Sequence, residues 1–390
     1  MTATQSDETT PEASGEDPTG HTESSPAAPS RLKGAGEVLV IYGVSILAAL
    51  AISVVLVATT GGSATEVLNA LLDGSLRAPG RWGSTLGVAA PLLLVALGTT
   101  INARAGLINI GQEGQLIIGA AMAAFLASRI GGPGVLGLIA ILLAGVAAGA
   151  IWAGIAGALK YWRSVPEVLT SLLLVTVAAQ LTGWGLNYTW ILLARFDEGR
   201  SNRAVYSDQL ATDMRLPHVT LFGNDFPISV IVGLVLALIV TIVLTRTVWG
   251  FQIRVLGQNP RTAQRSGVSA TKFGMTAMLL SGGFAGLAGA MMLAGGDFGN
   301  YRFAPGFAVN IGFDGLLVAL IARRNPIAVI PIALLFAMLR TGSGFLAATG
   351  VEREITDIVQ GLLVFAFLIP PAILFIRQRR RALAATRART

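Results

Sequence analysis

Long runs of apolar residues recur along most of this chain, separated by short polar segments. A helix needs about 20 apolar residues to cross the roughly 30 Å hydrocarbon layer of a membrane, and Val38–Ala58 meets this requirement. The pattern predicts ten transmembrane helices in an all-α, polytopic membrane protein, at residues 37–58, 83–101, 111–127, 135–159, 165–192, 228–249, 273–295, 306–322, 326–345 and 355–376.

The two ends of the chain lack this pattern. Residues 1–30 hold acidic residues, Ser, Thr, Pro and Gly without an apolar cluster, so they cannot bury enough surface to offset the entropy of ordering. A signal peptide would begin basic and then turn apolar, so the first apolar run is expected to be an uncleaved anchor. We therefore predict a disordered tail over residues 1–36, a membrane domain over 37–376 and a basic tail over 377–390.

A short polar motif occurs twice. Residues 109–114 read NIGQEG and residues 310–315 read NIGFDG, and each motif opens a short, glycine-interrupted apolar run. These are the third and eighth predicted helices, so the two motifs point in opposite directions across the membrane. Inverted repeats of this kind bring broken helices together near the midplane, where substrates bind. The sequence therefore predicts two inverted repeats of five helices each.

Both motifs place an acid within an apolar environment. Their glycines permit a break in the helix, and unwound backbone in a membrane is tolerated only where protein or water satisfies it. An ionisable residue there is costly and indicates function, so the acids either line a substrate path or cap helix starts, and both roles can hold together. We predict that the path is lined at this level by Asn109, Gln112, Glu113, Gln115, Asn310, Phe313 and Asp314.

A further polar position lies in the fifth predicted helix. Gln180 and Trp184 are four residues apart and therefore share a helix face. An aromatic ring and an amide suit a nucleobase or a sugar ring, through stacking and hydrogen bonding, so both residues are added to the predicted path. The alternative is that Trp184 belongs to the aromatic belt at the membrane surface.

Composition and charge set the orientation. The chain is 53% hydrophobic and 13% charged, whereas a soluble domain is about a quarter charged. With both ends in the cytoplasm, 18 of the 28 lysines and arginines lie inside and 9 lie outside, as the positive-inside rule requires. The net charge of +7 is thus an orientation signal and not a nucleic-acid site. The remaining basic residue, Arg340, is expected to extend its side chain to the outer membrane surface.

Small residues recur every fourth position in two predicted helices. The first stripe is Gly145, Gly149, Ala153 and Gly157, and the second is Gly282, Gly286 and Ala290. In a membrane such stripes let helix backbones approach closely. They predict tight packing and carry no information about a substrate.

The inner loop at residues 250–272 contains the signals of a short helix. Asn259 can cap the helix, Pro260 suits its first position and Gly267 can end it. Arg261 and Arg265 make it basic. We expect a helix of about two turns outside the membrane, and the alternative is an ordinary basic inner loop.

Three segments together resemble the permease subunits of ATP-binding cassette (ABC) importers of the ribose, branched-chain amino acid and nucleoside group. They are Asn102–Ala120, the G-x-N-P-x-x-A-x-x-x-G run of Gly257–Gly267, and Gly312–Asn325. NIGQEGQ and the segment Glu167–Ser171 are most similar to the nucleoside and simple-sugar permeases of this group. Arg261-Thr262-Ala263 departs from the acid and paired alanines of the looser importer signature.

The resemblance implies a set of partners. It implies a separate ABC ATP-binding subunit, a second permease subunit, identical or different, and a solute-binding lipoprotein that docks outside, for which residues 193–227 are the candidate surface. The ATP-binding subunit would contact loop 250–272 through Gly257, Asn259, Pro260, Arg261, Ala263, Arg265 and Gly267.

The chain has no means of its own to hydrolyse ATP. Its three lysines, Lys33, Lys160 and Lys272, follow no G-x-x-x-x-G pattern, so no phosphate-binding loop is possible. The chain has no cysteine and two histidines, and no metal site, cofactor or catalytic residue is predicted. We expect a non-enzymatic permease subunit in a bacterial cell membrane that carries a nucleoside or simple sugar inward.

Two other functions are compatible with the same residues. In an ion-gradient-driven secondary transporter, Glu113, Glu167 and Asp314 would carry the ion, and the helix near Asn259 would be incidental. In a membrane scaffold, none of these residues would serve transport.

Overall fold

A computed structural model describes most of the chain. The described residues are 31–58, 64–130, 134–195, 205–221, 224–296, 298–307, 309–348 and a part of the segment 358–380. Helix α1 (Arg31–Ala58) begins six residues before the first apolar run. The predicted N-terminal tail up to residue 30 and most of the C-terminal tail lie outside the described residues.

The described chain confirms an all-α, polytopic membrane fold. Within it, eight helices are long and apolar enough to cross a membrane: α1, α3 (Arg81–Arg104), α4 (Gln112–Ile130), α5 (Gly134–Arg163), α6 (Glu167–Gly185), α7 (Ile228–Arg246), α10 (Ala270–Gly295) and α12 (Pro326–Ala348). The eighth predicted run contains α11 (Ile311–Ile321), which has only 11 residues. The tenth run lies mostly outside the described residues, so ten spans and the two repeats stay predictions.

Several short elements are absent from the sequence-based prediction. Helix α2 (Ala64–Leu72) continues into a π-helical turn, Asp73–Arg77, and a 3₁₀ turn covers Thr212–Met214. Strands β1 (His218–Leu221) and β2 (Asn224–Pro227) form an antiparallel hairpin in which His218 faces Pro227. Helix α6 ends at Gly185, earlier than the predicted residue 192, because the chain turns back and the Leu192 N–H bonds the Gly185 carbonyl.

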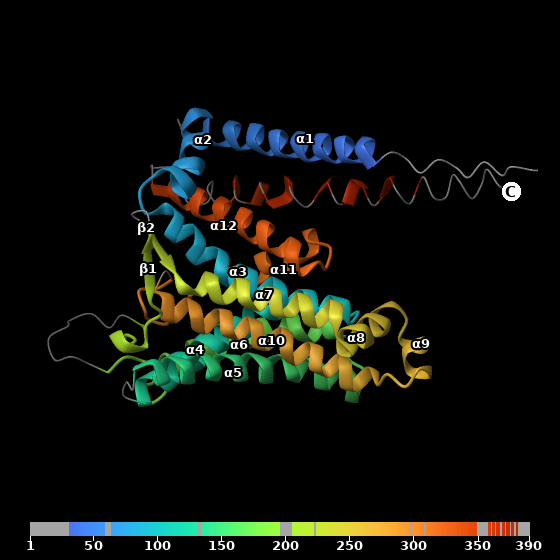
Figure 1. The fold of residues 1–390 in the computed structure, drawn as a ribbon. Helices are drawn as coiled ribbons and strands as arrows, with labels where there is room; N and C mark the ends of the chain where they lie inside the picture. The colour runs from blue at the N-terminus through green and yellow to red at the C-terminus, as the bar shows by residue number, and fades with distance from the viewer. Residues whose placement is uncertain are drawn as a thin grey trace, which may run out of the picture.

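The long helices run between two ends of the molecule (Figure 1). At one end, called here the hairpin end, lie α2, β1 and β2. At the other, called the α9 end, lie α8 (Val248–Gln258), α9 (Pro260–Arg265) and the start of α1. The basic residues Arg104, Arg246 and Arg324 end helices or follow them at the α9 end.

The core centres on α3 and α10, whose residues are buried along most of their lengths. The two predicted small-residue stripes face each other across α5 and α10. A Cβ on Gly149 would collide with the Gly282 carbonyl oxygen, and a Cβ on Gly286 would collide with the Gly145 carbonyl oxygen. The prediction of close backbone packing is confirmed, and it defines a glycine seam made of Gly145, Gly149, Gly282 and Gly286.

Candidate functional site

The two NIG motifs meet inside the core. The Glu113 carboxylate, in the first turn of α4, accepts hydrogen bonds from the backbone N–H groups of Asn310 (2.8 Å) and Gly312 (2.5 Å) at the start of α11. Gly312 leaves no room for a side chain, because its Cβ would overlap the Glu113 backbone. The acid of one motif therefore caps the helix that the other motif opens.

Helices α4 and α11 leave this meeting point in opposite directions. Helix α11 ends at the α9 end, where the Arg324 carbonyl accepts a hydrogen bond from Arg104 Nε (3.0 Å) at the end of α3. Helix α4 ends near the hairpin end, where Arg129 donates to the Trp190 carbonyl. The N-terminal ends of both helices, which carry partial positive charge, thus lie together around the Glu113 carboxylate.

Amides and hydroxyls around the first motif form a buried hydrogen-bond network. Asn109 and Gln115 exchange two hydrogen bonds of 2.9 and 3.0 Å. Gln112 accepts from the Thr99 hydroxyl (2.6 Å), and both Asn109 and Gln112 donate to the Ser281 hydroxyl. All three amide side chains are almost fully buried. The network ties the unwound segment before α4 to α3 and α10.

The second motif makes an ion pair. Asp314 Oδ2 lies 2.8 Å from Arg340 Nη1, and Arg340 Nη2 donates to the Val309 carbonyl at 2.6 Å. The expectation that Arg340 extends to the membrane surface is therefore wrong, because a carboxylate one helix away neutralises it within the protein. Phe313, the residue before Asp314, is half-buried, and Asn310 adopts the left-handed conformation (φ 65°) that Asn tolerates.

Gln180 and Trp184 are not part of this buried cluster. Both lie on an exposed face of α6. The Trp184 ring lies 5.2 Å from that of Tyr188, which lies 6.0 Å from that of Trp190. Sequence reasoning missed Tyr188 and Trp190, although the four-residue spacing of Trp184 and Tyr188 was a usable signal. The three rings form an aromatic row at the hairpin end of α6.

Glu167 is paired with a different basic residue from the one that pairs with Asp314. It forms an ion pair with Lys160 at 2.6 Å, between the end of α5 and the start of α6. Among the described residues, no group of three or more His, Cys, Asp or Glu side chains is placed to hold a metal ion.

The short helix expected near Asn259 is present as α9. The Asn259 side-chain oxygen accepts hydrogen bonds from the backbone N–H groups of Arg261 and Thr262, both at 3.1 Å. Pro260 occupies the first turn, and Gly267 follows with a left-handed φ of +81°. Ala263 is buried, whereas Arg261 and Arg265 are exposed. The predicted capping roles are confirmed.

Helix α8 connects α9 to the segment that leads into the first motif. Gly257, near the end of α8, packs against the turn after α3 so closely that a Cβ on it would overlap the Arg104 carbonyl oxygen. On the opposite side of the contact, Gly106 has a left-handed φ of +76°. The backbone from Gly106 then leads directly to Asn109.

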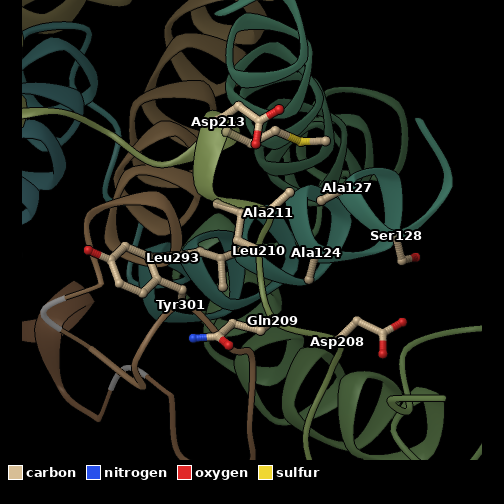
Figure 2. Close-up of a pocket in the computed structure, with 11 residues that line it drawn as sticks. Ala124, Ala127, Ser128, Asp208, Gln209, Leu210, Ala211, Asp213, Leu293 and Tyr301 are labelled. Carbon is tan, nitrogen blue, oxygen red and sulfur yellow. The ribbon is translucent and has the colours of Figure 1, made fainter. Parts of the chain in front are cut away.

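The hairpin end carries a cavity of about 210 Å³. Residues 205–217 fold back over α4 and α10: Ser207 N–H bonds the Phe303 carbonyl, and Leu216 N–H bonds the Ala294 carbonyl, both at 2.8 Å. Figure 2 shows Asp208 and Asp213 at separate edges of this cavity, with apolar side chains between them. The surface predicted to receive a binding protein is thus hollow and acidic at its edges.

Comparison with known proteins gives a consistent result. Residues 83–368 match the family described as "Branched-chain amino acid transport system / permease component". A guanosine ABC transporter permease protein of Bacillus subtilis is 29% identical over 87% of this chain and 95% of its own length. A glucose ABC transporter permease protein of Haloferax volcanii is 33% identical, with 83% and 85% covered.

A third relative, a nucleoside ABC transporter permease protein of Lactococcus lactis, is 25% identical over 78% of this chain and 84% of its own length. No solved structure matches the chain.

Proposed function

Since the chain belongs to the family of permease components of branched-chain amino acid transport systems, we propose that it forms the membrane path by which a nucleoside or a simple sugar enters the cell. The chain is a multi-pass permease subunit of an ABC importer. The solute class is supported by its relatives, which are permeases for guanosine, nucleosides and glucose. The finding that carries the proposal is the meeting of the two motifs through Glu113.

This meeting point has the properties of a transport site. Two helix starts converge within the membrane domain, and their free N–H groups and partial positive charge attract polar groups. Glu113 already occupies two of those N–H groups, so the site suits an uncharged solute better than a second anion. Asn310, which is exposed beside it, adds an amide that a sugar hydroxyl or a base edge can bond.

The exposed face of α6 supports a path that runs between two permease subunits. Gln180 lies 13 residues from the start of α6 and five from its end, which is about 20 Å and about 8 Å at 1.5 Å per residue. An amide at that depth facing hydrocarbon would lose its hydrogen bonds to water. A second permease subunit, identical or different, would instead enclose Gln180 and Trp184 around an aqueous path. The aromatic row at the end of α6 would stack on a base or sugar ring as it enters.

The two ends of the molecule offer separate surfaces for the proposed partners. A separate ABC ATP-binding subunit would dock on α9 at the α9 end, which we place in the cytoplasm together with both termini. A solute-binding lipoprotein would dock over residues 205–217 at the hairpin end. ATP-driven movement of α9 would pass through the contact of Gly257 with Arg104 and Gly106 to the unwound segment before α4.

Reconstitution tests the proposal directly. The permease, its ATP-binding subunit and its binding protein would be placed in vesicles, and uptake of radiolabelled guanosine and glucose would be measured. We expect uptake that requires ATP and the binding protein and that persists when proton and sodium gradients are collapsed. Uptake by the permease alone, driven by an ion gradient, would refute the proposal.

A variant separates transport from a scaffold role. Glu113→Ala leaves two N–H groups at the start of α11 without their acceptor, so uptake should be lost. Gly43→Ala in α1 is the control, because a Cβ on Gly43 meets nothing within 4 Å and α1 takes no part in the proposed path. Unchanged uptake by Glu113→Ala, at normal abundance in the membrane, would favour a scaffold.

A further inference from the structure

Four arginines line a cavity at the α9 end that the proposed path does not use. Arg104 ends α3, Arg254 lies on α8, and Arg323 and Arg324 form the turn after α11. The cavity has a volume of about 380 Å³ and is completed by Thr245, Gly257 and Gln258. We call it the arginine cavity.

The positive charge of this cavity is not neutralised within the described part of the chain. The ion pairs found there join Arg77, Lys160 and Arg340 to their acids, and none of the four arginines lies within 4 Å of a carboxylate. Like charges held together in this way repel one another, and an anion between them removes the repulsion. The chemistry of the cavity therefore calls for a negatively charged ligand.

Backbone carbonyls at helix ends hold the guanidinium groups in place. Arg254 Nη2 donates to the Leu244 carbonyl (3.1 Å), and Arg104 Nε donates to the Arg324 carbonyl (3.0 Å). These carbonyls carry only partial negative charge, so they orient the guanidinium groups without neutralising them. Several N–H donors of each group remain for a ligand, because a guanidinium has five.

The turn that carries two of the arginines is conformationally strained. Arg323 and Arg324 are consecutive non-glycine residues with left-handed φ angles of 50° and 61°. Side chains with a Cβ adopt this conformation at an energetic cost, and Gly or Asn would serve a simple connection between α11 and α12 better. Backbone strain of this kind concentrates at functional sites. Two arginines in these positions are best explained by a role of their side chains in binding.

The surroundings of the cavity distinguish a lipid from a soluble anion. Helix α8 follows α7 directly as the chain leaves the membrane, and it exposes Val248 and Phe251, whose exposed fractions are 72% and 62%. Phe251 lies three residues before Arg254 and therefore shares a helix face with it, and Val248 begins the same helix. Exposed apolar residues on a helix next to a membrane-spanning segment can lie against the acyl chains at the membrane surface, and basic pockets between helices at the cytoplasmic side suit acidic lipid head groups.

We propose that the arginine cavity binds the phosphate of an acidic phospholipid, with an acyl chain lying against Val248 and Phe251. The four guanidinium groups match phosphate oxygens with paired hydrogen bonds. Because Gly257 both lines the cavity and contacts the Arg104 carbonyl, a bound lipid would stiffen the contact between α8 and the segment that leads to the first motif.

A titration of the purified full-length permease in detergent tests this site. Thermal unfolding would be followed while dioleoyl phosphatidylglycerol, dioleoyl phosphatidylcholine or inorganic phosphate is added. We expect a saturable rise in Tm with phosphatidylglycerol alone. The half-saturating concentration should rise about fivefold for each arginine removed, and about 25-fold in the double variant Arg254→Gln/Arg323→Gln.

Two control variants distinguish a loss of lipid binding from a general loss of folding. Arg246→Gln removes a neighbouring exposed arginine that does not line the cavity, and it should leave the half-saturating concentration unchanged. Arg254→Lys/Arg323→Lys keeps the charge and should stay much closer to wild type than the glutamine pair does.

Three results would overturn the proposal. The first is an equal rise in Tm with phosphatidylcholine, and the second is an equal rise with inorganic phosphate alone. The third is an unchanged phosphatidylglycerol response in Arg254→Gln/Arg323→Gln together with lost binding of the ATP-binding subunit, which would assign the arginines to a protein carboxylate.

Discussion

At the scale of single residues, the acids of the two NIG motifs occupy matching positions but make different contacts. Glu113 is satisfied by two backbone N–H groups of the other motif, whereas Asp314 is satisfied by the Arg340 guanidinium. A buried charge is tolerated only when it is paired or hydrogen-bonded, and each acid meets that requirement in its own way. Equivalent sequence positions therefore do not imply equivalent roles.

The ion pair of Asp314 and Arg340 makes a prediction for a double-mutant cycle. Asp314→Asn or Arg340→Gln alone leaves the partner's charge buried and unpaired, so each should destabilise the fold by about 3–5 kcal/mol and lower Tm by several degrees. The double variant should recover a substantial part of that loss. Thermal unfolding in detergent measures all four proteins.

The control for this cycle is an exposed ion pair. Arg77 and Asp73 lie 3.9 Å apart, with side chains 60% and 41% exposed. Arg77→Gln should leave Tm nearly unchanged, because exposed ion pairs contribute at most about 1 kcal/mol. Strictly additive losses at Asp314 and Arg340 would show that the pair contributes nothing.

At the scale of elements, the glycine seam holds α5 and α10 closer than ordinary side chains allow. Helices in lipid gain nothing from hydrophobic association, so their packing depends on close backbone contact. The seam also places α10 so that Ser281 reaches the amides of Asn109 and Gln112. The packing of two structural helices thus positions the polar network beside the first motif.

The seam predicts a position-specific effect of adding one methyl group. Gly286→Ala should lower the stability of the fold by about 1–3 kcal/mol, because its Cβ would collide with the Gly145 carbonyl oxygen. Gly43→Ala in α1 should cause no loss, because nothing lies within 4 Å of its Cβ. Tm and the yield of monodisperse protein report both. Equal behaviour of the two variants would contradict the close contact.

Long apolar runs predicted the helices of the fold well, and short elements poorly. Each of the eight helices able to span a membrane falls on a predicted run, because lipid demands an apolar surface over a fixed length. Helix α2 and the β1–β2 hairpin were missed, since they are too short to show that periodicity. The early end of α6 at Gly185 depends on a turn that returns Leu192 to the helix end, and apolar composition continues through it.

At the site, the sequence indicated which segments meet but not which atoms. The repeated motif predicted two broken helices with opposite directions, and the starts of α4 and α11 do meet. It did not reveal that Glu113 would cap the other helix, because a contact between residues about 200 positions apart leaves no local signal. The predicted position of the Arg340 side chain was wrong for a related reason, because its partner, Asp314, lies on a different helix.

At the scale of the whole molecule, two glycines join the α9 end to the centre of the membrane domain. Gly257 on α8 packs against the turn that contains Gly106, and that turn leads to Asn109 and the start of α4. A contact made of two backbones has no flexible side chain between them, so displacement of one moves the other. This arrangement suits the transfer of movement from a docked ATP-binding subunit.

Gly257→Ala should therefore uncouple the two ends. Its Cβ would force α8 away from the Arg104 carbonyl oxygen, while Asn259 and the rest of α9 stay available for docking. We expect normal capture of the ATP-binding subunit in a pull-down but at least a tenfold fall in ATP-dependent uptake, which corresponds to about 1.4 kcal/mol of lost coupling. Gly43→Ala serves as the control. Normal uptake by Gly257→Ala would exclude this route.

The cap that Glu113 provides also bears on how the protein is made. Asn310, which donates one of its two hydrogen bonds, is synthesised 197 residues later, a delay of about 10–40 s at 5–20 residues per second. Until then the nascent chain carries an acid in α4 whose acceptor oxygens lack these two N–H donors. The helices made before α11 therefore enter the membrane without this cap on Glu113, and a chain truncated before α11 should be recognised as defective and degraded.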